Sequence, residues 1–216
     1  ENCRQLKSRG IIFSGPEHGD QACGDIGSGR MREPKDIVKD INSLEKRKKK
    51  LFKNKKVVIT AGPTEEAIDP VRYISNRSSG MMGCEIANAF HAQGAKVIIV
   101  KGPCKYSQNN EIESINVKTA SEMLMSVEKN ITNCDIFVSV AAVSDFIAKK
   151  LSSKKIKSED IPKLELEKNI DIIKKISENY KVFSIGFAAE TSELKENALK
   201  KLKEKKLSVI AANKVS

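Results

Sequence analysis

Short apolar runs and segments of helical periodicity alternate along most of this chain. Val57 to Ile59 form one unbroken apolar run, and Ala95 to Val100 form a second. Between them, the apolar residues of 86–90 recur at helical spacing, and this pattern stops near Gly94. A strand, a helix and a second strand in this order form a βαβ unit, whose two strands are parallel because the helix carries the chain back.

The same alternation continues towards the C-terminus. Further apolar runs predict strands over 112–117, 135–140, 182–187 and 207–211, and 164–167 alternates as an edge strand does. Helices are predicted after Thr119, around 172–176 and over 192–205, and Thr119 with Glu122 has the spacing of a capping box. The pattern therefore predicts an α/β fold, a Rossmann-like, doubly wound, mostly parallel sheet with helices on both faces.

The N-terminal part has a different character. It predicts a helix end that stops at Gly10, a short strand over 11–13 and a glycine-rich loop over 14–32. Helical periodicity returns over 33–44 and leads into a run of charged residues that is typical of a solvated linker. We expect three parts: 1–34, a helical charged linker over 35–50, and the main domain over 51–216.

Composition narrows the class of protein. With 216 residues and 39% hydrophobic content, the chain can bury one sizeable core. No apolar run approaches the ~20 residues that span a membrane, and the N-terminus lacks a signal-peptide pattern, so we expect a cytoplasmic protein without membrane contact. The five cysteines are widely spaced without a C-x-x-C pair, which favours free thiols over zinc or disulfides.

The net charge of +11 indicates an affinity for anions. The basic residues are not interleaved with aromatic ones, so we expect a phosphorylated small molecule rather than nucleic acid as the partner. In an open parallel sheet such a ligand binds beyond the carboxyl ends of the strands. Ser78 to Gly80 open a helix there, and free N–H groups at a helix start favour anions.

Several stretches resemble one enzyme family. The segment from Ile68 to Gly80, which reads IDPVRYISNRSSG, closely resembles the signature of phosphopantothenoylcysteine synthetase. Further stretches resemble motifs of that family and follow in the family's order: Ala141–Asp145, Lys155–Lys157, Lys168–Ile172, Gly186–Thr191 and Ala212–Ser216. The resemblance therefore covers nearly the whole main domain.

The resemblance implies a ligase of coenzyme A biosynthesis that joins 4′-phosphopantothenate to L-cysteine. The bacterial type uses CTP and Mg²⁺, passes through an acyl-cytidylate, and forms a homodimer through this domain. It implies catalytic roles for Asn76 and Lys155, and leaves the metal ligands open. It implies nucleotide contacts at Gly62, Ser78, Ser79, Gly80, Ser139, Val140, Ala141, Asp145, Lys155, Ile170, Asp171, Ile172, Ile173, Phe187, Lys201 and Lys205.

The stretch from Ala22 to Met31 resembles the C-terminal loop of the flavin-dependent decarboxylase to which the bacterial synthetase is commonly fused. That resemblance makes 1–34 the remnant of a decarboxylase domain whose FMN-binding part would precede Glu1. Cys23 would then be a proton donor in the full-length parent, which would decarboxylate the product to 4′-phosphopantetheine. In the chain alone, Cys23 is expected to be an exposed loop thiol.

The chain departs from the family pattern at three places. The family usually has proline where this chain has Ile170, commonly has lysine in place of Met81, and normally continues beyond Ser216. Two other functions therefore stay open: a nucleotide-binding module without turnover, and an NAD(P)-dependent reductase. The reductase would need a residue that binds the cofactor ribose just after the second strand, and Lys101 to Pro103 does not supply a convincing one. In addition, Gly62, Gly80 and Gly83 do not have the G-x-G-x-x-G spacing of a dinucleotide-binding loop.

Overall fold

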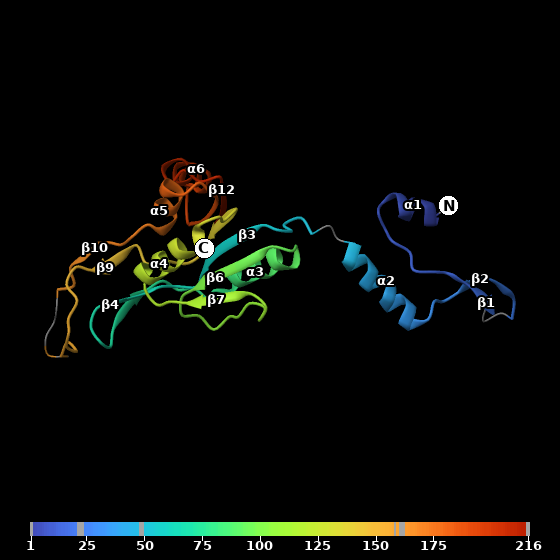
Figure 1. Cartoon of the computed structure of the whole chain (residues 1–216), viewed down its shortest axis with the longest axis horizontal. Helices are drawn as coiled ribbons and strands as arrows, with labels where there is room; N and C mark the ends of the chain where they lie inside the picture. The colour runs from blue at the N-terminus through green and yellow to red at the C-terminus, as the bar shows by residue number, and fades with distance from the viewer. Residues whose placement is uncertain (1, 21–23, 48–49, 158, 160–162, 215–216) are drawn as a thin grey trace. The chain divides into compact units, whose positions relative to one another are not determined.

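The computed structural model describes residues 2–20, 24–47, 50–157, 159 and 163–214 (Figure 1). The chain divides into two compact units, Glu1–Lys49 and Lys50–Ser216. Among the described residues, no helix has the length and the apolar character needed to cross a lipid bilayer.

The described residues of the first unit form two helices and one hairpin. Helix α1 (Asn2–Ser8) ends before Gly10, and helix α2 (Pro34–Arg47) follows the hairpin of β1 (Glu17–Asp20) and β2 (Ile26–Arg30). Both predicted helical segments are confirmed. The strand predicted over 11–13 is wrong, since these exposed apolar residues have no regular secondary structure. The hairpin was missed because its pairs, such as Gly19 with Gly27, give no apolar alternation.

The second unit is built on a six-stranded sheet in which all neighbouring strands are parallel. Its strand order is β12-β11-β8-β3-β6-β7. The strands are β3 (Lys56–Ala61), β6 (Lys96–Lys101), β7 (Glu113–Asn116), β8 (Ile136–Ser139), β11 (Phe183–Glu190) and β12 (Val209–Lys214). Apart from the edge strand over 164–167, every predicted strand of this sheet is present, with ends shifted by a few residues.

Helices cover both faces of this sheet. Helix α3 (Met81–Ala92) places Ala87 in one apolar cluster with Val57, whereas α4 (Ala120–Ile131) places Val127 in a second cluster with Val58. Consecutive residues of a strand point to opposite faces, so the two clusters lie on opposite sides of β3. Helices α5 (Ile172–Asn179) and α6 (Leu194–Glu204) contribute to the second cluster. The predicted doubly wound α/β fold is confirmed.

Local signals also set where α4 begins. The Thr119 side chain accepts a hydrogen bond from the Glu122 backbone N–H, and the Glu122 carboxylate accepts one from the Thr119 N–H. The predicted capping box is therefore confirmed. Such a cap typically stabilises a helix by about 1 kcal/mol, because it satisfies N–H groups that have no partner within the helix.

Two antiparallel hairpins leave the carboxyl end of the sheet and project from it side by side (Figure 1). The first pairs β4 (Glu65–Ala67) with β5 (Tyr73–Ser75), and the second pairs β9 (Phe146–Ala148) with β10 (Leu166–Lys168). The alternation over 164–167 thus belongs to this second hairpin and not to an edge of the main sheet. The buried carboxylate of Glu66 accepts a hydrogen bond of 2.9 Å from the Ala120 N–H and fixes the first hairpin to α4.

Candidate functional site

A cavity of about 770 Å³ lies at the carboxyl end of the sheet. Its size is typical of a site for a small organic ligand. It brings together predicted site residues that are far apart in the sequence of the second unit: Gly62, Asn76, Ser78, Ser79, Gly80, Ser139, Val140, Ala141, Asp145, Ile170, Asp171, Ile172, Ile173, Phe187, Lys201 and Lys205. Asn213, from the stretch Ala212–Ser216 that resembles a family motif, also lines it.

Two buried threonines fix one of the loops that line this cavity. The Thr60 hydroxyl accepts a hydrogen bond of 3.4 Å from the Ala141 N–H, and the Thr64 hydroxyl accepts one of 3.1 Å from the Ser144 N–H. Both side chains are at most 1% exposed. They fix the loop after β8 against the end of β3. The sequence did not predict these two hydrogen bonds, although Thr60, a polar residue near the end of an apolar strand, is a signal for one of them.

The start of α3 forms one wall. Gly80 has a φ of +75°, and a Cβ atom there would lie 2.5 Å from the Cys104 sulfur, so only glycine fits. The Ser78 hydroxyl accepts a hydrogen bond from the Gly80 N–H, and the Ser79 hydroxyl accepts one from the Met81 N–H. The first N–H groups of a helix have no carbonyl four residues earlier, and they attract anions.

Asn76 lies between the first hairpin and this helix. Its Nδ2 atom donates a hydrogen bond of 2.9 Å to the carbonyl oxygen of Val143, which follows β8. The side chain therefore joins two loops of the cavity and does not bond to its own turn. A carboxamide nitrogen carries two N–H donors, and the bond to Val143 uses one of them. The second is a hydrogen-bond donor that an oxygen of a ligand can use.

The opposite wall is formed by the start of α5 and by α6. Asp171 caps α5 by accepting a hydrogen bond from the Lys174 N–H, and its carboxylate forms an ion pair of 2.7 Å with Lys205. Lys201 donates a hydrogen bond of 2.7 Å to the carbonyl oxygen of Phe187. Burial, and then the neighbouring charge of Lys205, lowers the pKa of the Lys201 ammonium group. Both lysines line this wall of the cavity, and the Lys205 ammonium group lies at the start of α5.

The apolar residues of this wall have a second role. Ile172 and Ile173 are buried in the core, so only their backbone groups are available to a ligand. Ile170 donates its N–H to the Asn169 side chain at 2.8 Å. Phe187 packs against the α3 face of the core and lines the cavity as well. Core packing and ligand contact are therefore compatible at this position.

Two predicted residues are not part of this cavity. Lys155 is exposed and does not line it, because the turn that carries Lys155 is hydrogen-bonded to Ile68 and Asp69 on the first hairpin. Cys23 lies outside the described residues. Within the part of the chain that the structure describes, no group of three or more histidine, cysteine, aspartate or glutamate residues is arranged to hold a metal ion.

The fold and the cavity define a Rossmann-like α/β domain with a cavity of ligand size at the carboxyl end of its sheet. A sequence model of the DNA/pantothenate metabolism flavoprotein C-terminal domain matches residues 52–216, and the chain belongs to this family. The resemblance found in the sequence is thereby confirmed.

Individual relatives agree with this assignment. The coenzyme A biosynthesis bifunctional proteins CoaBC of Haemophilus influenzae and Vibrio parahaemolyticus are 43% and 42% identical to the chain, over 219 and 221 residues. The matches cover the whole chain but 54% and 55% of those proteins, so the chain spans about half of their length. The crystal structure of the C-terminal domain of a CoaBC protein has a TM-score of 0.67 at 40% identity, covering 75% of this chain and 78% of that one.

Proposed function

We propose that this chain is a phosphopantothenate–cysteine ligase of coenzyme A biosynthesis. One observation carries the proposal: stretches that resemble separate synthetase motifs, with Asn76, Asp145, Asp171 and Phe187, line a single cavity. Membership of the family and similarity to proteins named for coenzyme A biosynthesis support it. The acid substrate is 4′-phosphopantothenate, the amine is L-cysteine, and CTP is the activating nucleotide.

The reaction has two steps. A carboxylate oxygen of phosphopantothenate first attacks the α-phosphorus of CTP, and the bond to pyrophosphate breaks. In the acyl-cytidylate that results, the acyl carbon has a good leaving group. The cysteine nitrogen then attacks this carbon and loses a proton, CMP leaves, and an amide bond has formed. Both steps build up negative charge on oxygen, which fixed N–H dipoles and cations stabilise.

The cavity supplies both kinds of group. We assign the phosphates to the N–H groups at the starts of α3 and α5, with Lys201 and Lys205 as cations from α6. An ammonium group has three N–H donors, so Lys201 can contact a phosphate while it keeps its bond to Phe187. We assign Asn76 to the acyl-transfer step, where its second N–H stabilises the oxygen of the reacting carbonyl group.

The remaining partners are part of the same proposal. Mg²⁺ usually binds phosphate oxygens and water with one or two carboxylates. Asp145 is the fitting carboxylate, because it lines the cavity while Asp171 is paired with Lys205. When bound, Mg²⁺ would neutralise part of the phosphate charge. A homodimer and a decarboxylase part with FMN and Cys23 are proposed for the longer protein.

The reductase alternative has little support at the end of β6. The Lys101 ammonium group donates hydrogen bonds of 3.3 Å to the Tyr106 carbonyl oxygen and to the Gln108 side chain. Gly102 packs so closely on Pro63 that a Cβ atom would lie 1.7 Å from the Pro63 oxygen. These residues are engaged within the protein at the place where a dinucleotide ribose would have to be bound.

Nucleotide binding is the simplest test of the proposal. We expect CTP with Mg²⁺ to raise the melting temperature more than equal concentrations of ATP or NADPH. A ligand at 100 times its Kd stabilises the folded state by about 2.7 kcal/mol, which a thermal-shift assay detects readily. A shift with NADPH and none with CTP would instead support the reductase.

A further inference from the structure

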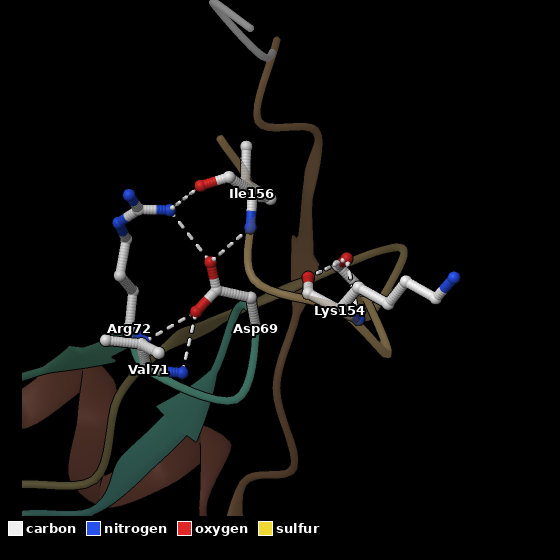
Figure 2. Close-up of polar contacts among 6 residues, drawn as sticks. Asp69, Val71, Arg72, Lys154 and Ile156 are labelled. Carbon is white, nitrogen blue, oxygen red and sulfur yellow. Dashed lines mark hydrogen bonds and ion pairs between the residues drawn. The ribbon is translucent and has the colours of Figure 1, made fainter. Parts of the chain in front are cut away.

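A buried carboxylate lies at the tip of the first hairpin, in a part of the synthetase signature that the cavity does not use. The Asp69 side chain is fully buried, and four hydrogen bonds converge on it (Figure 2). Its Oδ1 atom accepts hydrogen bonds from the N–H groups of Val71 and Arg72, both at 2.7 Å. Its Oδ2 atom accepts hydrogen bonds from Arg72 Nη1 at 2.8 Å and from the Ile156 N–H at 3.1 Å.

The two oxygen atoms serve different segments. The contacts of Oδ1 close the turn between β4 and β5, whereas Oδ2 binds Ile156, which is 87 residues further along the chain. Arg72 Nη1 also donates a hydrogen bond of 3.1 Å to the Ile156 carbonyl oxygen. At the other end of the same turn, the Ser152 N–H donates one of 3.0 Å to the Ile68 carbonyl oxygen. The turn 152–156 is therefore held at both ends.

Asp69 is ionised at neutral pH. Its burial alone would raise the pKa, but the N–H groups of Val71, Ile156 and Arg72, together with the guanidinium charge, hold the pKa at about 2. Hydrogen bonds to an ionised acceptor are stronger than those to a neutral one. A neutral side chain of the same shape would therefore hold the turn less firmly.

We propose that Asp69 is a positioning residue, whose carboxylate holds the turn 152–156 on the first hairpin. It thereby fixes the backbone position from which the Lys155 side chain acts. Lys155 lies between the two attachment points, Ser152 and Ile156, and its side chain is exposed. The same hairpin leads through β5 to Asn76. Asp69 thus connects the two segments that carry the predicted catalytic side chains: the turn with Lys155 and the hairpin that leads to Asn76. This inference rests on the proposed function, because it assumes that Lys155 acts on the nucleotide.

The alternative is that Asp69 only closes its own turn through Val71 and Arg72. A double-mutant cycle separates the two roles, because residues that act through one another are not additive. We expect Asp69→Asn to lower kcat for pyrophosphate release by about tenfold or more, since a small displacement of a catalytic group is costly. In a Lys155→Gln background, the same change should cost less than about twofold. An equal loss in both backgrounds, no loss, or a gain in activity would overturn the proposal.

Asp135→Asn is the matched control. The Asp135 carboxylate likewise accepts a hydrogen bond from the Lys56 backbone N–H and one from the Lys55 ammonium group, both at 2.8 Å. It precedes β8 and so lies at the end of the sheet opposite the cavity. We expect this variant to keep the kcat of the wild type, even if its melting temperature falls.

Amide exchange tests the contact without any turnover. In Asp69→Asn, the Ile156 amide should exchange roughly tenfold faster by NMR, whereas Asp135→Asn should leave it unchanged. If the wild type released no pyrophosphate, the proposed function would fail, but this exchange rate would still decide whether Asp69 holds the turn. If Asp69→Asn does not fold, Arg72→Gln removes the guanidinium contacts to Asp69 and Ile156 and should give the same faster exchange. Unchanged exchange at Ile156 would contradict the proposal.

Discussion

Asn76→Asp should stop the reaction after its first step. We expect the variant to release pyrophosphate from CTP and phosphopantothenate in a single turnover and then to stall with acyl-cytidylate bound when cysteine is added. The change replaces an N–H donor by a carboxylate oxygen, which cannot donate to the reacting carbonyl group and repels the Val143 carbonyl oxygen that Asn76 now contacts. Loss of one such donor typically lowers the rate by 10²–10³-fold.

Asn130→Asp is the matched control for this variant. The Asn130 side chain also donates to a backbone carbonyl oxygen, that of Ser126 at 2.8 Å, but it lies on α4 and does not line the cavity. It should keep full turnover. Full turnover in Asn76→Asp would exclude a catalytic role for Asn76, and loss of pyrophosphate release would assign it to the activation step.

Lys155→Gln should lower pyrophosphate release by ~10²-fold or more, which corresponds to a few kcal/mol of transition-state stabilisation. The lost group is a cation that would stabilise the charge on the phosphates. In this structure Lys155 is exposed and outside the lining of the cavity, so its effect depends on the reach of its side chain from the turn 152–156. Quench-flow measurement of the first turnover separates this step from acyl transfer.

Lys154→Gln removes the same charge one residue earlier. The Lys154 side chain extends away from the Asp69 carboxylate, and the hydrogen bonds between this residue and the Ser152 hydroxyl use only the Lys154 backbone (Figure 2). We expect this variant to keep nearly all activity. Equal activity of Lys155→Gln and the wild type would show that Lys155 is only a solvated charge.

The sheet could be predicted because its strands are buried on both faces. Val57 to Ile59 pack under helices from two sides, and such strands give unbroken apolar runs that are easily recognised. The hairpins were largely missed for the opposite reason, although the alternation over 164–167 marked one strand of the hairpin of β9 and β10. Strands such as β4, with the sequence Glu65 to Ala67, are held by backbone pairing and single buried polar groups, which leave no apolar pattern.

The cavity was predicted from the strand assignment and the motif resemblance, but its details were not. Periodicity predicts strands whose carboxyl ends meet at one edge of the sheet, yet it does not reveal that Thr60 and Thr64 fix the loop after β8. Nor does it reveal where an exposed lysine on a long connection will lie. The position of Lys155 depends on the bond between Asp69 and Ile156, two residues that are far apart in the sequence.

The structure also clarifies two departures from the family pattern. Ile170 donates its backbone N–H to Asn169, a bond that proline cannot make. This bond restrains the chain just before the start of α5, where proline would restrain it through its ring. Met81 is the first residue of α3 and is half exposed. A lysine at this position would add a positive charge at the start of the helix, and methionine does not.

The central claim is that the chain activates phosphopantothenate with CTP, and the release of pyrophosphate tests it most directly. The wild-type chain is mixed with phosphopantothenate, L-cysteine, Mg²⁺ and either CTP or ATP, and pyrophosphate and phosphopantothenoylcysteine are measured together. We predict that the two products appear in equal amounts with CTP and much more slowly with ATP. Equal or faster turnover with ATP would contradict CTP as the activating nucleotide, and no pyrophosphate with either would show a nucleotide-binding domain without ligase activity.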